Sequence, residues 1–177
     1  MSGAADFAHR LPLDRIRDGE RIELRADEAE RAAVASRARL VSLDRLDAHV
    51  ALARDGAAIS ATGRVRARLQ QACVATGEPV PAAIDEPFAL RFLPEPGGRA
   101  GDDELELGAG DLDTMFHDGA GIDLGAAIID TLVLALDPYP RSPGAAVALK
   151  QAGVIGEDEA GPFAALGALK ARMSGEA

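Results

Sequence analysis

The sequence has few aromatic residues and only one cysteine. With no Trp, one Tyr and five Phe, its core must be built from Leu, Ile, Val and Ala. The single cysteine, Cys73, excludes an intramolecular disulfide. The longest apolar run, at 124–136, is too short to span a bilayer and contains Asp130. The chain also does not start with a basic stretch followed by an apolar run, so we expect a soluble, cytoplasmic protein that makes no contact with membranes.

The net charge of −10 is distributed unevenly along the chain. Residues 1–100 contain fifteen Arg and fifteen Asp or Glu, whereas residues 101–177 contain four basic and fourteen acidic residues. The acidic half, 101–177, would repel a polyanion, which could approach only a local patch on the first half. The same acidic half suits a basic protein partner.

Alternating apolar side chains predict most of the secondary structure of the first hundred residues. The expected strands lie at 7–13, 21–24, 46–52, 59–70 and 83–95. Hairpins followed by helices, without a regular alternation of strand and helix, predict an α+β fold with a mainly antiparallel β-sheet.

Two helices are expected to pack on this sheet. The first is N-terminal and runs from Asp27 to about residue 40, because Asp27 and Glu30 have the spacing of a capping box. The second, near 123–137, begins after a good N-cap residue and is apolar nearly all round, so we expect it to be well buried.

The domain organisation follows from composition. Residues 1–140 are predicted to form a single α+β domain with a mobile, acidic, Gly-rich loop near 95–104 and a possible short strand at 105–107. Residues 141–177 are predicted to be a flexible acidic tail with a short helix near 162–173.

The strand at 59–70 places three arginines on one face. Residues two apart in a strand point the same way and lie about 6.5–7 Å apart, so Arg64, Arg66 and Arg68 form a ladder about 13 Å long. Such a ladder is a plausible track for a phosphate backbone or an acidic protein surface, with Arg91 as a further contact. The alternative is a solvated face whose arginines pair with Asp85, Glu86 or a carboxylate of another strand.

Aromatic residues do not add to the case for nucleic acid. Phe88 and Phe92 share the inward face of their strand with Leu90, so the sequence predicts no platform on which bases could stack.

Cys73 is the one candidate nucleophile. It would need a base among His9, His49 and His117, and a lone cysteine near a strand end is more often a small buried apolar residue. We therefore expect no catalytic residue, and we find no phosphate-binding loop.

A metal site is not expected either. Thr76 stands where a second thiolate would be needed after Cys73, and His117 with Asp118 and Asp123 follows no ligand pattern. We expect no cofactor.

Two blocks of the sequence together resemble the YceD family, the large ribosomal RNA subunit accumulation proteins. The blocks are "ARLQQACVATGEPVPAAIDEPFALRFLPE" and, some thirty residues later, "GAGIDLGAAIIDTLVLALDPYPR". The residues that carry the resemblance are Cys73, Thr76, Glu78, Pro79, Ile122, Asp123, Leu124, Pro138 and Pro140.

The resemblance implies a role in production or stability of the large-subunit ribosomal RNA, and no enzyme activity. Many members carry a second cysteine in place of Thr76 and more cysteines after Pro140, which suggests a metal site in those members. This chain lacks those cysteines, so Cys73 is interpreted as a relic or a packing residue.

Three functional hypotheses remain. In the leading one, a non-enzymatic factor binds precursor RNA through the arginine ladder, or binds an assembly protein, with the acidic half meeting a basic ribosomal protein. The second is a small enzyme that uses Cys73 as its nucleophile. The third is an interaction module unrelated to ribosomes, which docks through helix 123–136 if that helix is exposed.

Overall fold

The computed structural model describes residues 7–95 and 113–154, and these residues form an α+β fold. The strands are β1 (Arg10–Pro12), β2 (Arg21–Arg25), β3 (Ser42–Asp55), β4 (Ala58–Ala72), β5 (Pro79–Pro94), β6 (Asp113–His117) and β7 (Gly121–Asp123). The helices are α1 (Glu28–Arg37), α2 (Leu124–Leu134) and α3 (Ala145–Gln151).

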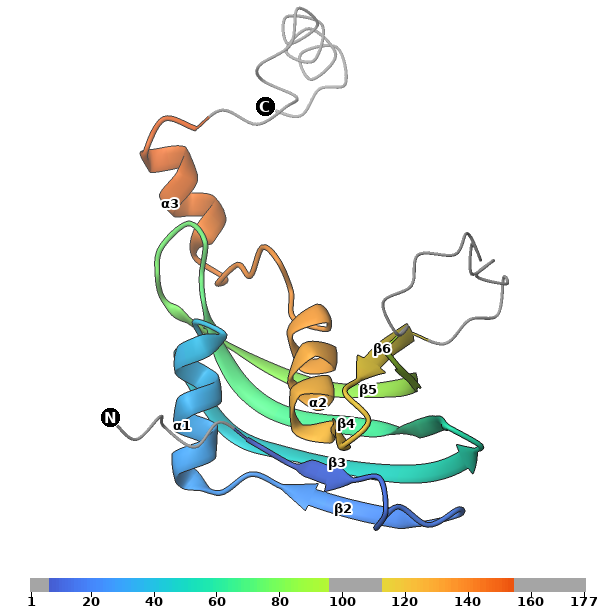
Figure 1. Ribbon diagram of the computed structural model, residues 1–177. Coiled ribbons are helices and arrows are strands. Elements are labelled where there is room, and N and C mark those ends of the chain that lie inside the picture. The colour runs from blue at the N-terminus through green and yellow to red at the C-terminus, as the bar shows by residue number, and fades with distance from the viewer. Residues whose placement is uncertain (1–6, 96–112, 155–177) are drawn as a thin grey trace, which may run out of the picture. The chain divides into compact units, whose positions relative to one another are not determined.

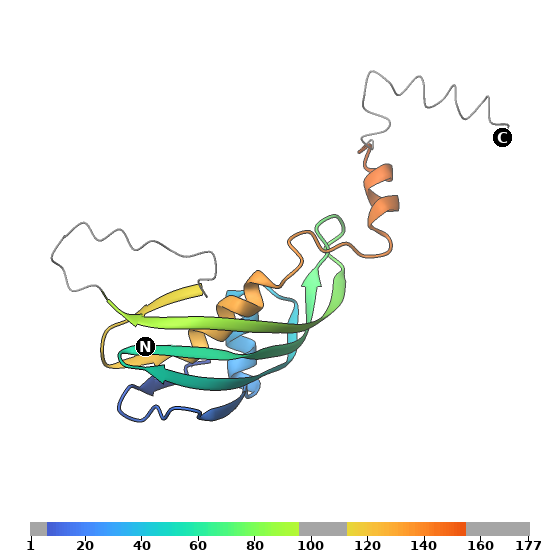
Figure 2. The ribbon, with the colours of Figure 1, turned by 90° about the vertical axis from the view of Figure 1, so that its right-hand side faces the viewer.

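Five strands form the main sheet, in the order β2-β3-β4-β5-β6. The pairs β2–β3 and β3–β4 are antiparallel, and the edge strand β6 is parallel to β5. The two short strands β1 and β7 pair separately. Figure 2 shows β3, β4 and β5 running side by side as the long strands of the sheet. The predicted fold class, α+β with a mainly antiparallel sheet, is confirmed.

Helices α1 and α2 cover one face of the sheet (Figure 1). The alternate apolar residues of β3, β4 and β5 point toward the helices and form one buried cluster with them. From β4 this cluster takes Ile59, Ala61, Val65, Ala67 and Leu69. Since one face of each strand is buried in this way, the opposite side chains are directed away from the helices.

The helix starts agree with the sequence. The Asp27 carboxylate accepts from the Glu30 amide at 2.8 Å and the Glu30 carboxylate accepts from the Asp27 amide at 2.8 Å, which completes the capping box. Asp123 caps α2 by accepting from the Ala126 amide at 3.0 Å. The α1 helix ends at Arg37, short of the expected residue 40, and Arg39 adopts a positive φ of 55°.

The apolar helix α2 is buried over most of its length. Six of its residues are buried, namely Leu124, Gly125, Ala127, Ile128, Ile129 and Leu132. The exposed residues lie toward its end and include Asp130 and Leu134, which is 83% exposed. The expectation of a buried helix is confirmed, and the hypothesis of a docking module that uses an exposed helix loses its basis.

Several boundaries differ from expectation. The strand expected at 46–52 extends over Ser42–Asp55, and the one expected from 83 starts at Pro79. The sequence did not predict β6, β7 or α3, although α3 falls within the expected flexible tail. Three predicted segments lie outside the described residues. They are the loop at 95–104 from residue 96 on, the strand at 105–107 and the helix at 162–173.

The chain divides into two compact units. The first consists of Met1–Gln71 and Pro81–Pro138 and holds the sheet with α1 and α2. The second consists of Ala72–Val80 and Tyr139–Ala177, and its described part holds a tight turn and α3. The predicted boundary at residue 140 stays a prediction.

The glycine at position 63 is required by close packing in the middle of β4. A Cβ added there would lie 2.0 Å from the His49 carbonyl oxygen and 2.9 Å from the Phe88 ring. We expect Gly63→Ala to lower the free energy of unfolding by about 2 kcal/mol or more, because overpacking forces the backbone apart. Chemical denaturation checks this, with Thr62→Ala on the exposed side of the same strand as the control. Equal unfolding midpoints for the two variants would contradict the packing described here.

Candidate nucleic-acid interface

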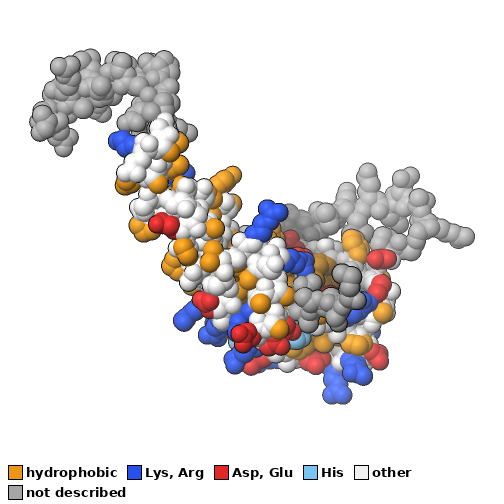
Figure 3. Space-filling model, turned by 90° about the vertical axis from the view of Figure 1, so that its left-hand side faces the viewer, with side chains coloured by type: hydrophobic (Ala, Val, Ile, Leu, Met, Phe, Trp, Pro, Cys, Tyr) orange, Lys and Arg blue, Asp and Glu red, His pale blue; other side chains and the backbone are white. Residues whose placement is uncertain are grey.

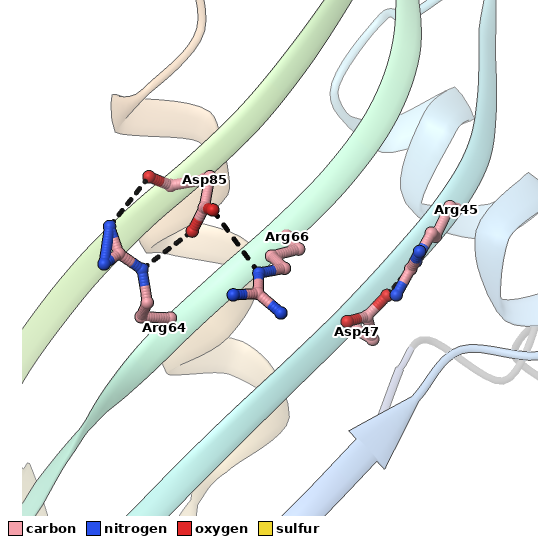
Figure 4. Close-up of polar contacts among 5 residues, drawn as sticks. All are labelled: Arg45, Asp47, Arg64, Arg66 and Asp85. Carbon is pink, nitrogen blue, oxygen red and sulfur yellow. Dashed lines mark hydrogen bonds and ion pairs between the residues drawn. The ribbon is translucent and has the colours of Figure 1, made fainter.

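The side chains of Arg64, Arg66 and Arg68 lie on the sheet face that is opposite to the helices. All three are exposed, while Val65, Ala67 and Leu69 are buried. Figure 4 shows Arg64 and Arg66 in front of the strands with the helices behind them. The alternation predicted from the sequence is therefore present, and a role for these arginines in binding stays a prediction.

Neighbouring strands add arginines that the sequence analysis missed. In the β3–β4 register Arg45 is opposite Arg68 and Asp47 is opposite Arg66. In the β2–β3 register Arg25 is opposite Asp47. We use the name arginine face for the outward arginines of β2 to β5. They are Arg21, Arg25, Arg45, Arg64, Arg66, Arg68 and Arg91.

The carboxylates that share this face with the arginines are Glu23, Asp47, Asp55 and Asp85, and Asp44 lines a hollow together with Arg68. Seven arginines against these five carboxylates leave a small local positive excess on a chain whose net charge is −10. This local excess attracts an anionic partner over a short range, within about a Debye length of 8–10 Å. Figure 3 shows the side of the molecule that is on the left in Figure 1, where basic and acidic side chains are interspersed.

Asp85 on β5 links two rungs of the ladder. Its carboxylate accepts from Arg64 Nε at 2.7 Å and lies 3.4 Å from Arg66 Nε (Figure 4). The hydrogen bond from Arg64 is the main reason that the pKa of Asp85 is lowered from its ordinary value. The side chains of Arg64 and Arg66 remain 48% and 47% exposed, so both guanidinium groups can still reach a ligand.

Asp47 lies at the centre of the arginine face and is only 4% exposed. One of its oxygens, Oδ1, accepts from Arg45 Nε, as Figure 4 shows. The other oxygen, Oδ2, is buried and has no hydrogen-bond partner. A buried carboxylate among arginines orders their side chains, which lowers the entropy that a ligand must remove on binding.

Four arginines of this face have no ion pair within residues 7–95 and 113–154. They are Arg21, Arg25, Arg68 and Arg91. The alternative interpretation, in which the ladder is paired with carboxylates, is thus confirmed for Arg64 and Arg66 but not for Arg68.

A shallow hollow of about 550 Å³ lies on the arginine face. Arg21, His49, Thr62, Arg64 and Arg66 are among the residues that line it. The Glu23 carboxylate, which also lines the hollow, lies 3.4 Å from the His49 ring nitrogen Nδ1. Guanidinium, imidazole and hydroxyl groups around one hollow suit phosphate oxygens.

Cys73 belongs to the second unit and is 3% exposed. Its sulfur accepts from the Ser142 backbone amide at 3.3 Å. That bond, together with one from the Thr76 hydroxyl, lowers the pKa of Cys73 to about 6. The sulfur is thus buried and held by hydrogen bonds that favour the thiolate, and the interpretation of Cys73 as a relic or a packing residue stays a prediction.

Residues of the first sequence block that carries the family resemblance contact residues at the end of the second block and just after it, close to Cys73. The Val74 amide donates to the Pro140 carbonyl at 2.9 Å, and the Thr76 and Ser142 hydroxyls are 3.2 Å apart. Thr76 also donates to the Glu78 carboxylate at 3.1 Å, and the Ser142 and Thr76 hydroxyls lower the pKa of Glu78. These contacts join the turn before β5 to the segment before α3.

The comparisons with known proteins identify the family. Residues 61–170 match the family model described as large ribosomal RNA subunit accumulation protein YceD. The chain belongs to the YceD family. No curated protein and no solved structure matches it. Among the described residues, no helix is long and apolar enough to cross a membrane.

The YceD motif residues of this chain have structural roles. Asp123 caps α2 and Leu124 is buried in the core, while Cys73, Thr76 and Glu78 hold the turn of the second unit. One thiolate, the Glu78 carboxylate and two hydroxyls do not fit a structural zinc site, which takes four ligands that are mostly paired thiolates or imidazoles. The described part of the chain contains no cluster of three side chains that could hold a metal.

The ion pair between Asp85 and Arg64 can be tested by titration. We expect Arg64→Gln to raise the pKa of Asp85 toward its ordinary value, because the main hydrogen bond to the carboxylate is lost. The pKa of Asp85 is lower in the folded than in the unfolded state, so the ion pair stabilises the fold at neutral pH. This stabilisation is lost as the pH falls through the lowered pKa. Carboxyl NMR titration measures the shift.

Arg68→Gln is the matched control, because Arg68 does not contact Asp85 and should leave the pKa of that carboxyl unchanged. Equal pKa values for Asp85 in both variants would show that the ion pair is absent in solution.

Proposed function

We propose that this YceD-family protein supports accumulation of large-subunit ribosomal RNA as a non-catalytic factor that binds precursor RNA through the arginine face. The observation that carries the proposal is the row of outward arginines on β3 and β4, with Arg68 and Arg91 left without ion pairs in the described residues. RNA is the polyanion that the family name points to.

The geometry favours RNA over a basic protein as the partner of this face. Guanidinium groups form bidentate hydrogen bonds with phosphates, and their spacing of about 6.5–7 Å along β4 presents one cation after another to a backbone. A basic ribosomal or assembly protein would instead be repelled here. It could still approach the acidic residues 101–177, which makes such a protein the alternative partner.

The arginine ladder gives the first test of this proposal. We expect the double variant Arg64→Glu and Arg66→Glu to weaken the association with large-subunit precursors by more than about tenfold near physiological salt, because attraction becomes repulsion at two phosphate contacts. Filter binding of precursor RNA at several salt concentrations gives the slope of the logarithm of the binding constant against the logarithm of salt concentration. The magnitude of this slope should be smaller for the variant by about 1 to 2.

The matched control is Arg141→Glu with Lys150→Glu, which makes the same change in net charge on the second unit. Both variants must retain the wild-type circular dichroism spectrum. If precursor RNA travels with the ladder variant in gradient fractions as it does with the wild type, the arginine face is not the RNA site.

The enzyme hypothesis can be tested at Cys73. The thiol is 3% exposed and its sulfur accepts from a backbone amide, so a substrate has no access to it. We expect Cys73→Ser and Cys73→Ala to support near-normal accumulation of large-subunit RNA in a cell that lacks the wild-type protein. Complete loss of accumulation by two well-folded variants would favour a catalytic thiol.

A further inference from the structure

The edge strand β6 carries an exposed aromatic residue that the sequence analysis did not single out. Phe116 is 56% exposed, whereas its neighbour His117 is 5% exposed. Because successive side chains of a strand point to opposite faces, Phe116 points away from the side on which His117 is buried. A large apolar ring in this position is not part of the core.

The register places Phe116 on the arginine face. Phe116 is opposite Leu93 and Thr114 is opposite Arg91, and paired residues of parallel strands point to the same side. Arg91 lies between the buried residues Leu90 and Phe92, so it points outward with Leu93. The ring is therefore next to an arginine that has no ion pair in the described part of the chain.

One extended nucleic-acid strand can contact both the ring and the arginine ladder. Phe116 lies two strands, or about 10 Å, from β4 across the sheet. The His117 ring nitrogen is 3.3 Å from the Ala57 carbonyl, so this part of β6 lies at the Ala57 end of β4. Arg64 is seven residues further along the chain, or about 23 Å at 3.3 Å per residue. A single strand of several nucleotides that follows the β4 arginines could span this distance and place a base at β6.

We propose that Phe116 and Arg91 form a stacking platform for an unpaired base, and that the RNA bound by the arginine face is single-stranded. The proposal rests on the proposed function. In a duplex the bases are stacked on each other and a side chain on a flat sheet cannot reach them, whereas the bases of a single strand can lie against a ring and a guanidinium plane.

The competing ligand is an acidic peptide that uses Phe116 only as an apolar anchor. The two ligands differ in what they require at position 116. Base stacking needs an aromatic plane, which Tyr supplies and Leu does not. An apolar contact with a peptide would tolerate Leu.

Fluorescence anisotropy of the full chain provides the test. The probes are an unstructured 12-nucleotide RNA and a blunt RNA duplex with the same number of phosphates per molecule. We expect the wild type to bind the single strand more tightly than the duplex. Phe116→Leu should weaken binding of the single strand by about five- to tenfold or more, because one stacked base is lost, and should leave duplex binding unchanged. Phe116→Tyr should retain the wild-type affinity.

The control is Leu134→Ala, which truncates an 83% exposed apolar side chain on α2 and should not alter either affinity. If Phe116→Leu binds the single strand like the wild type, while the Arg64 and Arg66 variant does not, the stacking platform is refuted and the RNA function stands. If the ladder variant also binds normally, the RNA function itself is refuted. Binding of a poly-glutamate peptide in preference to RNA, retained in Phe116→Leu, would assign the face to an acidic protein.

Discussion

The period-two alternation of β4 is the constraint on which the rest of the structure depends. Its apolar side chains fix that strand against α1 and α2, and this burial directs Arg64, Arg66 and Arg68 to the other face. A shift of one residue in register would place three guanidinium groups in the core, at a cost of several kcal/mol for each ion, so the display of cations follows from the packing. The lack of a side chain at Gly63 leaves room for the Phe88 ring and the His49 carbonyl, and so favours this register.

An acidic chain can present a cationic face because the arginines there outnumber the carboxylates. Asp85 pairs with Arg64 and Arg66 without covering them, and the buried Asp47 accepts a hydrogen bond from Arg45, whose side chain is 51% exposed. These pairs reduce repulsion among the arginines when no ligand is bound, while Arg68 and Arg91 keep their charge available. The acidic excess of the whole chain would then oppose non-specific binding of polyanions. Binding would depend on how well the ligand's phosphates fit the arginine face.

Local signals predicted much of this, and long-range pairing explains what was missed. The capping box of α1, the cap of α2 and the faces of β4 each depend on residues that are close in sequence. The neighbourhood of Arg45 and Arg68 depends on the β3–β4 register and on its bulge between Leu43 and Arg45, which no local pattern encodes. Strand β6 has only five residues and pairs in parallel with β5 across a long connection, so Phe116 could not be assigned to a face. Helix α3 has no side-chain cap and was missed for that reason.

The most direct test of the central claim is the pattern of backbone amide shifts when unstructured RNA is titrated into the protein labelled with ¹⁵N. The account predicts that the largest shifts lie on β3, β4, β5 and β6 around Arg45, Arg66, Arg91 and Phe116, with α1, α2 and the turn at Cys73 largely unmoved. Shifts concentrated in the second unit or on the helices, with the outer sheet unchanged, would contradict it.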